Sequence, residues 1–260
     1  MSELIFIEGV SGVGKSTMIR MLSEKLNEQG RRTRAYLEFD FTNPIDFYCT
    51  AYLTSEEYRN LCKTFPGELD ALRRHTIPAG DVWLVRYFDD DTPLFVPTLL
   101  AELRKKEFCY HPAHLVSLEE YTTAYRHVWE NFAADIDDTY DYILFDGSLL
   151  HHPINDMMRN YHITGEQAVL HVTTLLRALG ARKRRIFYLE TDDIGAQLTR
   201  AHIDRGQNPP SAEDIRFWQT RHRNDRIVLK QIHEESRIFD ISGGTWDSAR
   251  EQIEHLLIHR

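Results

Sequence analysis

An apolar segment near the start of the chain leads directly into three closely spaced glycines and a lysine. Residues 4–8 read LIFIE, residues 9–16 read GVSGVGKS, and residues 15–27 carry apolar side chains at helical spacing. Short apolar runs bounded by glycine are typical of buried strands, and apolar residues three and four positions apart are typical of a helix face. The pattern predicts a strand, a glycine loop and a helix, and this order of elements favours an α/β fold.

Residues 9–16 satisfy the pattern G-x-x-x-x-G-K-[ST] in the setting that the pattern requires, between a strand and a helix. Glycines allow successive backbone N–H groups to point at phosphate oxygens, and the N-terminus of the following helix adds partial positive charge. Lys15 is predicted to reach the β and γ phosphates of ATP, and the Ser16 hydroxyl to bind Mg²⁺. The predicted nucleotide-binding residues of this P-loop are Gly9, Ser11, Gly12, Val13, Gly14, Lys15, Ser16 and Thr17.

Four further apolar segments predict the remaining strands of a parallel sheet. They cover residues 32–38, 140–147, 184–190 and 237–242, and helical patterns follow each of them. Residues 40–139 interrupt this alternation of strands and helices. They contain helical patterns and one strand or hairpin candidate at residues 81–87. The expected fold is a three-layer P-loop NTPase fold with a five-stranded, mainly parallel sheet. A single domain over residues 1–260 would carry a largely helical insertion at 40–139, between the second and third core strands, on the substrate side.

Composition narrows the class of partner. The net charge is −9 and the pI is about 5.8, which disfavours binding to nucleic acid or to an anionic membrane surface. The three cysteines have no metal-ligand spacing, no apolar run reaches the length of a membrane span, and no signal peptide is evident. A cytoplasmic protein with a small-molecule partner is expected, either alone or as a homodimer.

The segment EGVSGVGKST resembles the loop of the P-loop nucleoside and nucleotide kinases, particularly thymidylate kinase and its relatives. The segment YLETDDIGAQLTRAHIDRGQ, residues 188–207, resembles the fourth strand and the lid of these kinases. This resemblance implies that Arg200 and Arg205 are lid arginines that neutralise the transferring phosphoryl group; solvated helix charges are the alternative. The closing segment resembles the loop that packs beside adenine, which implies that Ser242, Gly243 and Gly244 lie there.

Asp146 ends the most apolar strand, YDYILFDG, and is the predicted Mg²⁺ ligand beside the P-loop. A carboxylate at that strand end shares the metal with the phosphate oxygens, although an aspartate there also often caps a turn. Gly147 stands where thymidylate kinases commonly carry an arginine, and this departure argues against thymidylate as the acceptor.

Glu38 and Asp40 follow the second strand. Several small-molecule P-loop kinases, such as shikimate kinase and chloramphenicol phosphotransferase, have an acidic residue on the acceptor side at this place. Either carboxylate is a candidate general base for a hydroxyl acceptor, and a turn or cap role is the alternative for each.

His151, His152, Asn155 and Asp156 follow Asp146 closely and are expected to line the same cleft or to cap a helix. A metal site among them is not predicted, because Pro153 interrupts the first helical turn and no third ligand is evident.

Together these features predict an ATP- and Mg²⁺-dependent kinase of a small molecule. The acceptor group is a hydroxyl or a phosphate, on a nucleoside, a nucleotide or a hydroxylated natural product such as an antibiotic. The paucity of arginine clusters in the insertion favours a neutral or cationic hydroxyl compound. The alternative is a nucleotide-dependent regulatory ATPase or switch that acts on a protein partner.

Overall fold

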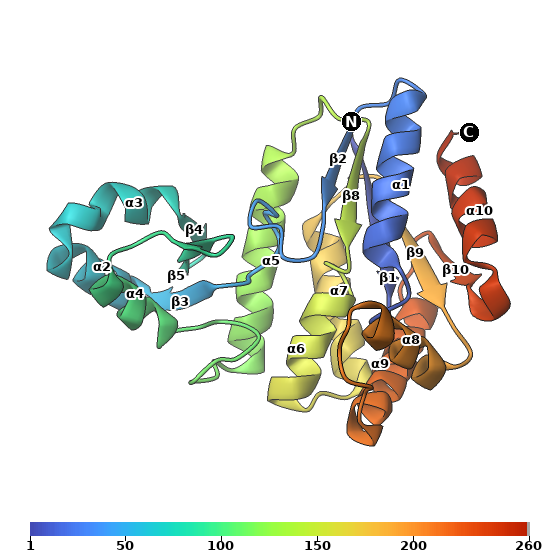
Figure 1. Ribbon diagram of the computed structural model, residues 1–260. Helices are drawn as coiled ribbons and strands as arrows, with labels where there is room; N and C mark the ends of the chain where they lie inside the picture. Colours follow the sequence, from blue (N-terminus) through green and yellow to red (C-terminus); the bar gives the residue numbers. More distant parts are fainter. Residues whose placement is uncertain (259–260) are drawn as a thin grey trace. The chain divides into compact units, whose positions relative to one another are not determined.

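The computed structural model describes residues 1–258 (Figure 1). The chain forms two compact units. Residues 1–38, 136–173 and those from 181 onward form the first unit, and residues 39–135 and 174–180 form the second. No helix within residues 1–258 combines the length and the apolar character that a membrane crossing requires.

The first unit is built on a five-stranded sheet in the order β10-β9-β1-β8-β2. The strands are β1 (Glu3–Gly9), β2 (Thr33–Tyr36), β8 (Tyr142–Asp146), β9 (Arg184–Glu190) and β10 (Ser236–Asp240). Every pairing in this sheet is parallel, so the carboxyl ends of all five strands share one edge. The five predicted core strands and their parallel arrangement are confirmed.

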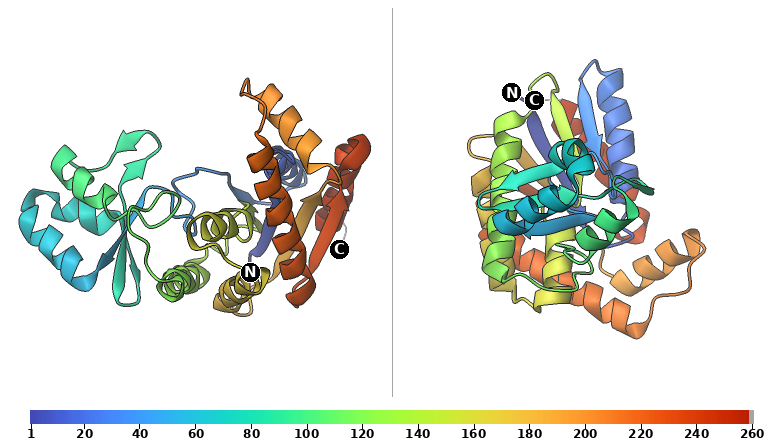
Figure 2. Two further views of the ribbon diagram at one scale, coloured as in Figure 1. Left: turned by 90° about the horizontal axis from the view of Figure 1, so that it is seen from below. Right: turned by 90° about the vertical axis from the view of Figure 1, so that its left-hand side faces the viewer.

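Helices cover both faces of this sheet (Figure 2). They are α1 (Lys15–Glu28), α6 (His151–Tyr161), the part of α7 (Gly165–Ala178) up to residue 173, α8 (Ile194–Asp204), α9 (Ala212–Gln231) and α10 (Trp246–Ile258). On one face, Ile5 and Ile7 of β1 pack in a core that takes in residues of α1, α8 and α10. On the other face, the Tyr188 hydroxyl of β9 donates to Asp225 of α9 at 2.8 Å. Each aliphatic side chain buried in such a core contributes about 2 kcal/mol to stability, which fixes the helices against the sheet.

The second unit contains a sheet as well as helices. Its antiparallel sheet has the order β3-β5-β4, and β6 and β7 form a two-stranded ribbon. The elements are β3 (Thr50–Thr54), α2 (Ser55–Thr64), α3 (Leu69–Arg74), β4 (Thr76–Ala79), β5 (Val82–Arg86), β6 (Phe88–Asp89), β7 (Thr92–Pro93), α4 (Pro97–Arg104) and α5 (Leu118–Asp135), with a 3₁₀ turn at Pro66–Glu68. This unit has its own apolar core, which includes Leu53, Leu72, Val85, Leu99 and Leu103.

The expectation of a largely helical insertion at 40–139 was therefore incomplete. Only β5 coincides with the strand candidate at residues 81–87. The strands β3 and β4 have five and four residues, and β4 contains Pro78. Runs this short give little alternation to detect, and proline is tolerated in a strand chiefly at a sheet edge, where β4 lies.

Candidate functional site

The glycine loop joins the carboxyl end of β1 to the first turn of α1. Gly12 and Gly14 have φ angles of 82° and 87°, in the left-handed region that favours glycine. Gly14 is the N-cap residue of α1, so the N-terminus of this helix opens onto the loop. Unpaired N–H groups and the helix dipole at such a terminus attract phosphate. The loop of residues 9–16 thus has the backbone conformation and the setting of a P-loop.

Lys15 is almost fully buried, with 7% of its surface exposed. Its ammonium group donates to the carbonyl oxygens of Gly9 at 3.2 Å and Val10 at 3.1 Å. It also lies 3.4 Å from Nδ1 of His151. These contacts hold the lysine beneath the loop, at the wall of a cavity of about 390 Å³.

Ser16 and Asp146 meet beside this loop. The parallel register pairs Asp146 with Ile7 of β1, which brings the carboxylate to the sheet edge where the loop begins. The Ser16 hydroxyl donates to Oδ2 of Asp146 at 2.5 Å. Oδ1 of Asp146 is buried and has no hydrogen-bond partner within residues 1–258. A hydroxyl and a carboxylate with an unused buried oxygen are ligands of the kind that Mg²⁺ takes, so the residues present fit this ion.

Glu8, the last residue before the loop, is fully buried. Its carboxylate accepts backbone hydrogen bonds from Leu149 at 2.9 Å and His151 at 3.0 Å. Burial raises the pKa of Glu8 to about 7, although these hydrogen bonds and the charge of Arg221 act to lower it. Glu8 therefore ties β1 to the segment between Asp146 and α6.

His151 lies between the loop and α9. Its Nδ1 is 3.0 Å from the Gly9 carbonyl oxygen, and its ring stacks on Trp218 with centroids 5.3 Å apart and planes 17° from parallel. Burial and the neighbouring charge of Lys15 hold the pKa of His151 well below its usual range, so the ring is neutral. Gly147 allows the backbone of residue 147 to lie close to His151, because a Cβ atom on residue 147 would lie 2.7 Å from Cβ of His151.

Most of the predicted site residues line one cavity. It is lined by Ser11, Gly12, Gly14, Lys15, Ser16, Thr17, Arg20, Glu38, His151, Gln197, Ala201, Asp204 and Arg205. Gly9 and Val13 are buried and are not among the residues that line it. Of the two acids predicted as a base, Glu38 lines this cavity. Asp40 belongs to the second unit, where its carboxylate accepts from the backbone and hydroxyl of Thr42 at 2.8 and 2.6 Å.

The two predicted lid arginines have different positions. Arg205, the C-cap residue of α8, lines the cavity. Arg200 is exposed on α8 and is not among the lining residues. The helix itself packs closely on the loop, because a Cβ atom on Gly12 would lie 2.6 Å from Cβ of Ala201.

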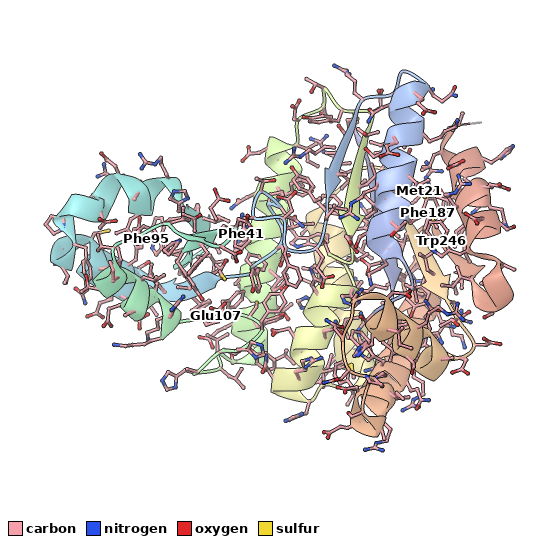
Figure 3. The ribbon with its side chains drawn as sticks, viewed as in Figure 1. Met21, Phe41, Phe95, Glu107, Phe187 and Trp246 are labelled. Carbon is pink, nitrogen blue, oxygen red and sulfur yellow. The ribbon has the colours of Figure 1, made fainter. Side chains whose placement is uncertain are left out.

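Ser242 and Gly243, predicted to lie beside adenine, form a 3₁₀ turn after β10 and are not among the residues that line the cavity. The Ser242 hydroxyl accepts from the backbone N–H of Asp192 at 3.0 Å. The C-terminal segment contacts the P-loop through Trp246 (Figure 3) instead. The indole N–H of Trp246 donates to the Val13 carbonyl oxygen at 3.1 Å. An adenine role for Ser242 and Gly243 stays a prediction.

Three polar residues that line the cavity were not predicted from the sequence: Arg20, Gln197 and Asp204. Arg20 follows Ser16 by four residues in α1, and this spacing on one helix face was a signal that could have found it. Gln197 donates to the Gly12 carbonyl at 2.7 Å. No sequence pattern marks Gln197, since its contact depends on how α8 packs against the loop.

No family model matches the sequence, and no curated protein matches it. Among the solved structures that are similar to this chain is a thymidylate kinase from Candida albicans. The two sequences are 13% identical, and the match covers 98% of this chain and 91% of the thymidylate kinase chain, with a TM-score of 0.48. The parallel sheet, the loop between β1 and α1, and the Ser16–Asp146 pair of this chain have the arrangement of a P-loop fold.

Proposed function

We propose that the protein is an ATP-dependent phosphotransferase that moves the γ-phosphate of MgATP to a hydroxyl or phosphate group of a small molecule. One observation carries this proposal: the cavity that is lined by Lys15 and Ser16 of the P-loop is also lined by Glu38, beyond the end of β2. A site for phosphoryl transfer needs phosphate-binding groups on one side and an acceptor-side acid or base on the other.

The nucleotide-side roles follow from chemistry. Lys15 would extend to the β and γ phosphates from its present place on the Gly9 and Val10 carbonyls. Ser16 and Asp146 would hold Mg²⁺, which neutralises charge on the phosphate oxygens. Arg205 supplies a further positive charge to the cavity for the transferring group.

Glu38 is the preferred candidate for the acceptor-side base. It lines the cavity, and its side chain is 39% exposed and can reach a hydroxyl that enters. Asp40 is less suited, because its carboxylate already accepts two hydrogen bonds within its own turn. The acceptor class extends over nucleosides, nucleotides and hydroxylated natural products.

The test is a mass-spectrometric screen of the purified protein with MgATP and a panel of nucleosides, nucleotides, aminoglycosides and other hydroxylated antibiotics. We expect one acceptor class to gain a single phosphate. Lys15→Ala should lower the rate by a factor on the order of 10² to 10³, the usual cost of losing one group that stabilises transition-state charge. The matched control is Lys25→Ala, which removes a lysine of the same helix whose ion pair with Glu28 is exposed.

Full transfer activity in Lys15→Ala would overturn the assignment. ATP hydrolysis that depends on an added protein, without a phosphorylated small molecule, would favour the regulatory switch instead.

A further inference from the structure

We propose that Glu38, His151 and His152 form a second metal site, which takes a divalent transition-metal ion such as Zn²⁺ and is separate from the Mg²⁺ site of Ser16 and Asp146. One nitrogen of each imidazole and one oxygen of the carboxylate lie within 4.8 Å of one another. Both imidazoles are buried, with 5% and 6% of each residue exposed. Glu38 is the third ligand that the sequence alone did not provide.

The sheet brings these three residues together. β2 pairs in parallel with β8, and Tyr36 lies opposite Phe145. Glu38 follows β2 by two residues, and the histidines open α6 a few residues after β8. Pro153 does not disturb this start, because a proline in the first turn of a helix gives up an N–H that has no partner there. The backbone N–H of His152 donates to Gly147 at 2.9 Å, which fixes the turn.

The surroundings of His151 resemble those of a metal-binding histidine. Such a histidine usually binds the metal through one ring nitrogen and donates the N–H of the other ring nitrogen to a carbonyl or carboxylate. This hydrogen bond orients the ring and fixes the tautomer. Nδ1 of His151 lies 3.0 Å from the Gly9 carbonyl oxygen, and in the tautomer that donates this hydrogen bond the lone pair is on Nε2. The Lys15 ammonium is 3.4 Å from Nδ1. In that tautomer the Lys15 ammonium and the metal ion would lie at opposite edges of the His151 ring.

The donor set selects the kind of ion. Two imidazoles and one carboxylate suit Zn²⁺ and related ions, which leave further positions to water or substrate, whereas Mg²⁺ prefers oxygen ligands. Oε1 of Glu38 and Nε2 of His152 are 3.9 Å apart. Metal bonds of about 2.1 Å at tetrahedral angles place two ligand atoms about 3.4 Å apart. The exposed Glu38 side chain can move to close this difference.

Glu38 and His151 both line the P-loop cavity, so the open positions of the ion would face it. A metal ion lowers the pKa of a bound water or hydroxyl group. The ion would thus take an oxygen of the acceptor and make that hydroxyl more acidic. With the ion bound, this effect would replace the general-base role of Glu38, whose carboxylate would then be a metal ligand. This role of the ion rests on the proposed phosphoryl transfer, whereas binding of the ion does not.

The experiment is calorimetric titration of the intact, chelator-treated protein with Zn²⁺ in excess Mg²⁺ and without nucleotide. A parallel titration with Co²⁺ follows its visible absorption, which reports imidazole ligands and low coordination number. We expect one tightly bound ion per chain. Glu38→Gln and His152→Ala should each weaken binding more than tenfold, and His233→Ala, which removes an exposed histidine beyond α9, should not.

Glu38→Gln changes an exposed side chain, so it tests the site even if His152→Ala fails to fold. Absence of tight Zn²⁺ binding in excess Mg²⁺, or affinity that is unchanged in Glu38→Gln, would overturn the proposal. Lys15→Ala should lower the rate of phosphoryl transfer by a factor on the order of 10² to 10³ yet keep Zn²⁺ binding. The failure of either proposal is thereby distinguished from the failure of the other.

Discussion

At the scale of single residues, Asp146 is the side chain whose environment most constrains its role. It is 1% exposed, one oxygen accepts from Ser16, and the other has no hydrogen-bond partner within the described part of the chain. Leaving a buried carboxylate oxygen unpaired costs free energy that a bound cation would recover.

We expect Asp146→Asn to raise the Mg²⁺ concentration needed for half-maximal phosphoryl transfer at least tenfold, because an amide oxygen carries no full charge. The measurement is the initial rate as a function of free Mg²⁺ at saturating ATP. Thermal unfolding of the variant without ligand provides the control for folding. A Mg²⁺ dependence equal to that of the parent would remove Asp146 from the metal role.

Glu8 gives a prediction for stability as a function of pH. Burial raises its pKa to about 7 in the folded chain, above the ordinary glutamate value of about 4.3. Between these values the folded state binds more protons than the unfolded state, so the contribution of Glu8 to the free energy of unfolding falls as pH rises. The fall is at most about 1.4 kcal/mol per pH unit and smaller near each of the two pKa values, which gives about 3 kcal/mol between pH 4.5 and pH 7.5.

Glu8→Gln removes this titration. The difference in unfolding free energy between parent and variant should therefore shift by about 3 kcal/mol in favour of the variant between pH 4.5 and pH 7.5. Urea denaturation at several pH values measures it, with Glu24→Gln on the exposed side of α1 as the control. A difference that is constant with pH would mean that Glu8 is ionised throughout.

At the scale of elements, the packing of α8 on the P-loop can be tested with two glycines. Gly12 and Gly206 both have positive φ angles, of 82° and 66°. A Cβ atom on Gly12 would meet Cβ of Ala201 at 2.6 Å, whereas nothing lies within 4 Å of one on Gly206. Both changes to alanine strain the backbone, but only Gly12→Ala also forces α8 and the loop apart.

We expect Gly206→Ala to cost about 1 kcal/mol of stability, and Gly12→Ala about 2–4 kcal/mol together with a large loss of ATP affinity. Chemical denaturation and calorimetric titration with MgATP measure the two effects. Equal costs in the two variants would show that the loop and α8 do not constrain each other.

The elements also show what the sequence could predict. The five core strands were found because each is an apolar run that glycine or acidic residues terminate, and α1 was found from the spacing of Met18, Ile19 and Leu22. The P-loop residues were predicted from a pattern with a fixed spacing, and Asp146 from its place at the end of the most apolar strand. The strands β3 and β4 were missed because their stabilisation comes from pairing with β5 rather than from their own sequence.

The same reasoning explains what was missed in the site. Glu38 and His152 are more than a hundred residues apart, and their approach to 3.9 Å depends on the pairing of β2 with β8. Strand order is set by tertiary packing and cannot be obtained from periodicity. The contact of Gln197 with Gly12 has the same origin.

At the scale of the whole molecule, the chain divides into two compact units, each with its own apolar core. The P-loop cavity is lined by residues of the first unit alone. A ligand that binds only the folded form stabilises what it binds by RT ln(1 + [L]/Kd), about 2.7 kcal/mol at a hundredfold excess over Kd. If the units unfold separately, this gain belongs to the first unit.

We therefore expect MgATP, without acceptor, to slow amide hydrogen exchange in β1, α1 and β8 about a hundredfold, and to leave exchange in β3 and β5 nearly unchanged. Exchange followed by mass spectrometry at peptide resolution measures this, with Lys15→Ala as the control that should lose the protection. Equal protection of β5 and β8 would show instead that both cores unfold in one cooperative step, so that the nucleotide stabilises the whole chain at once.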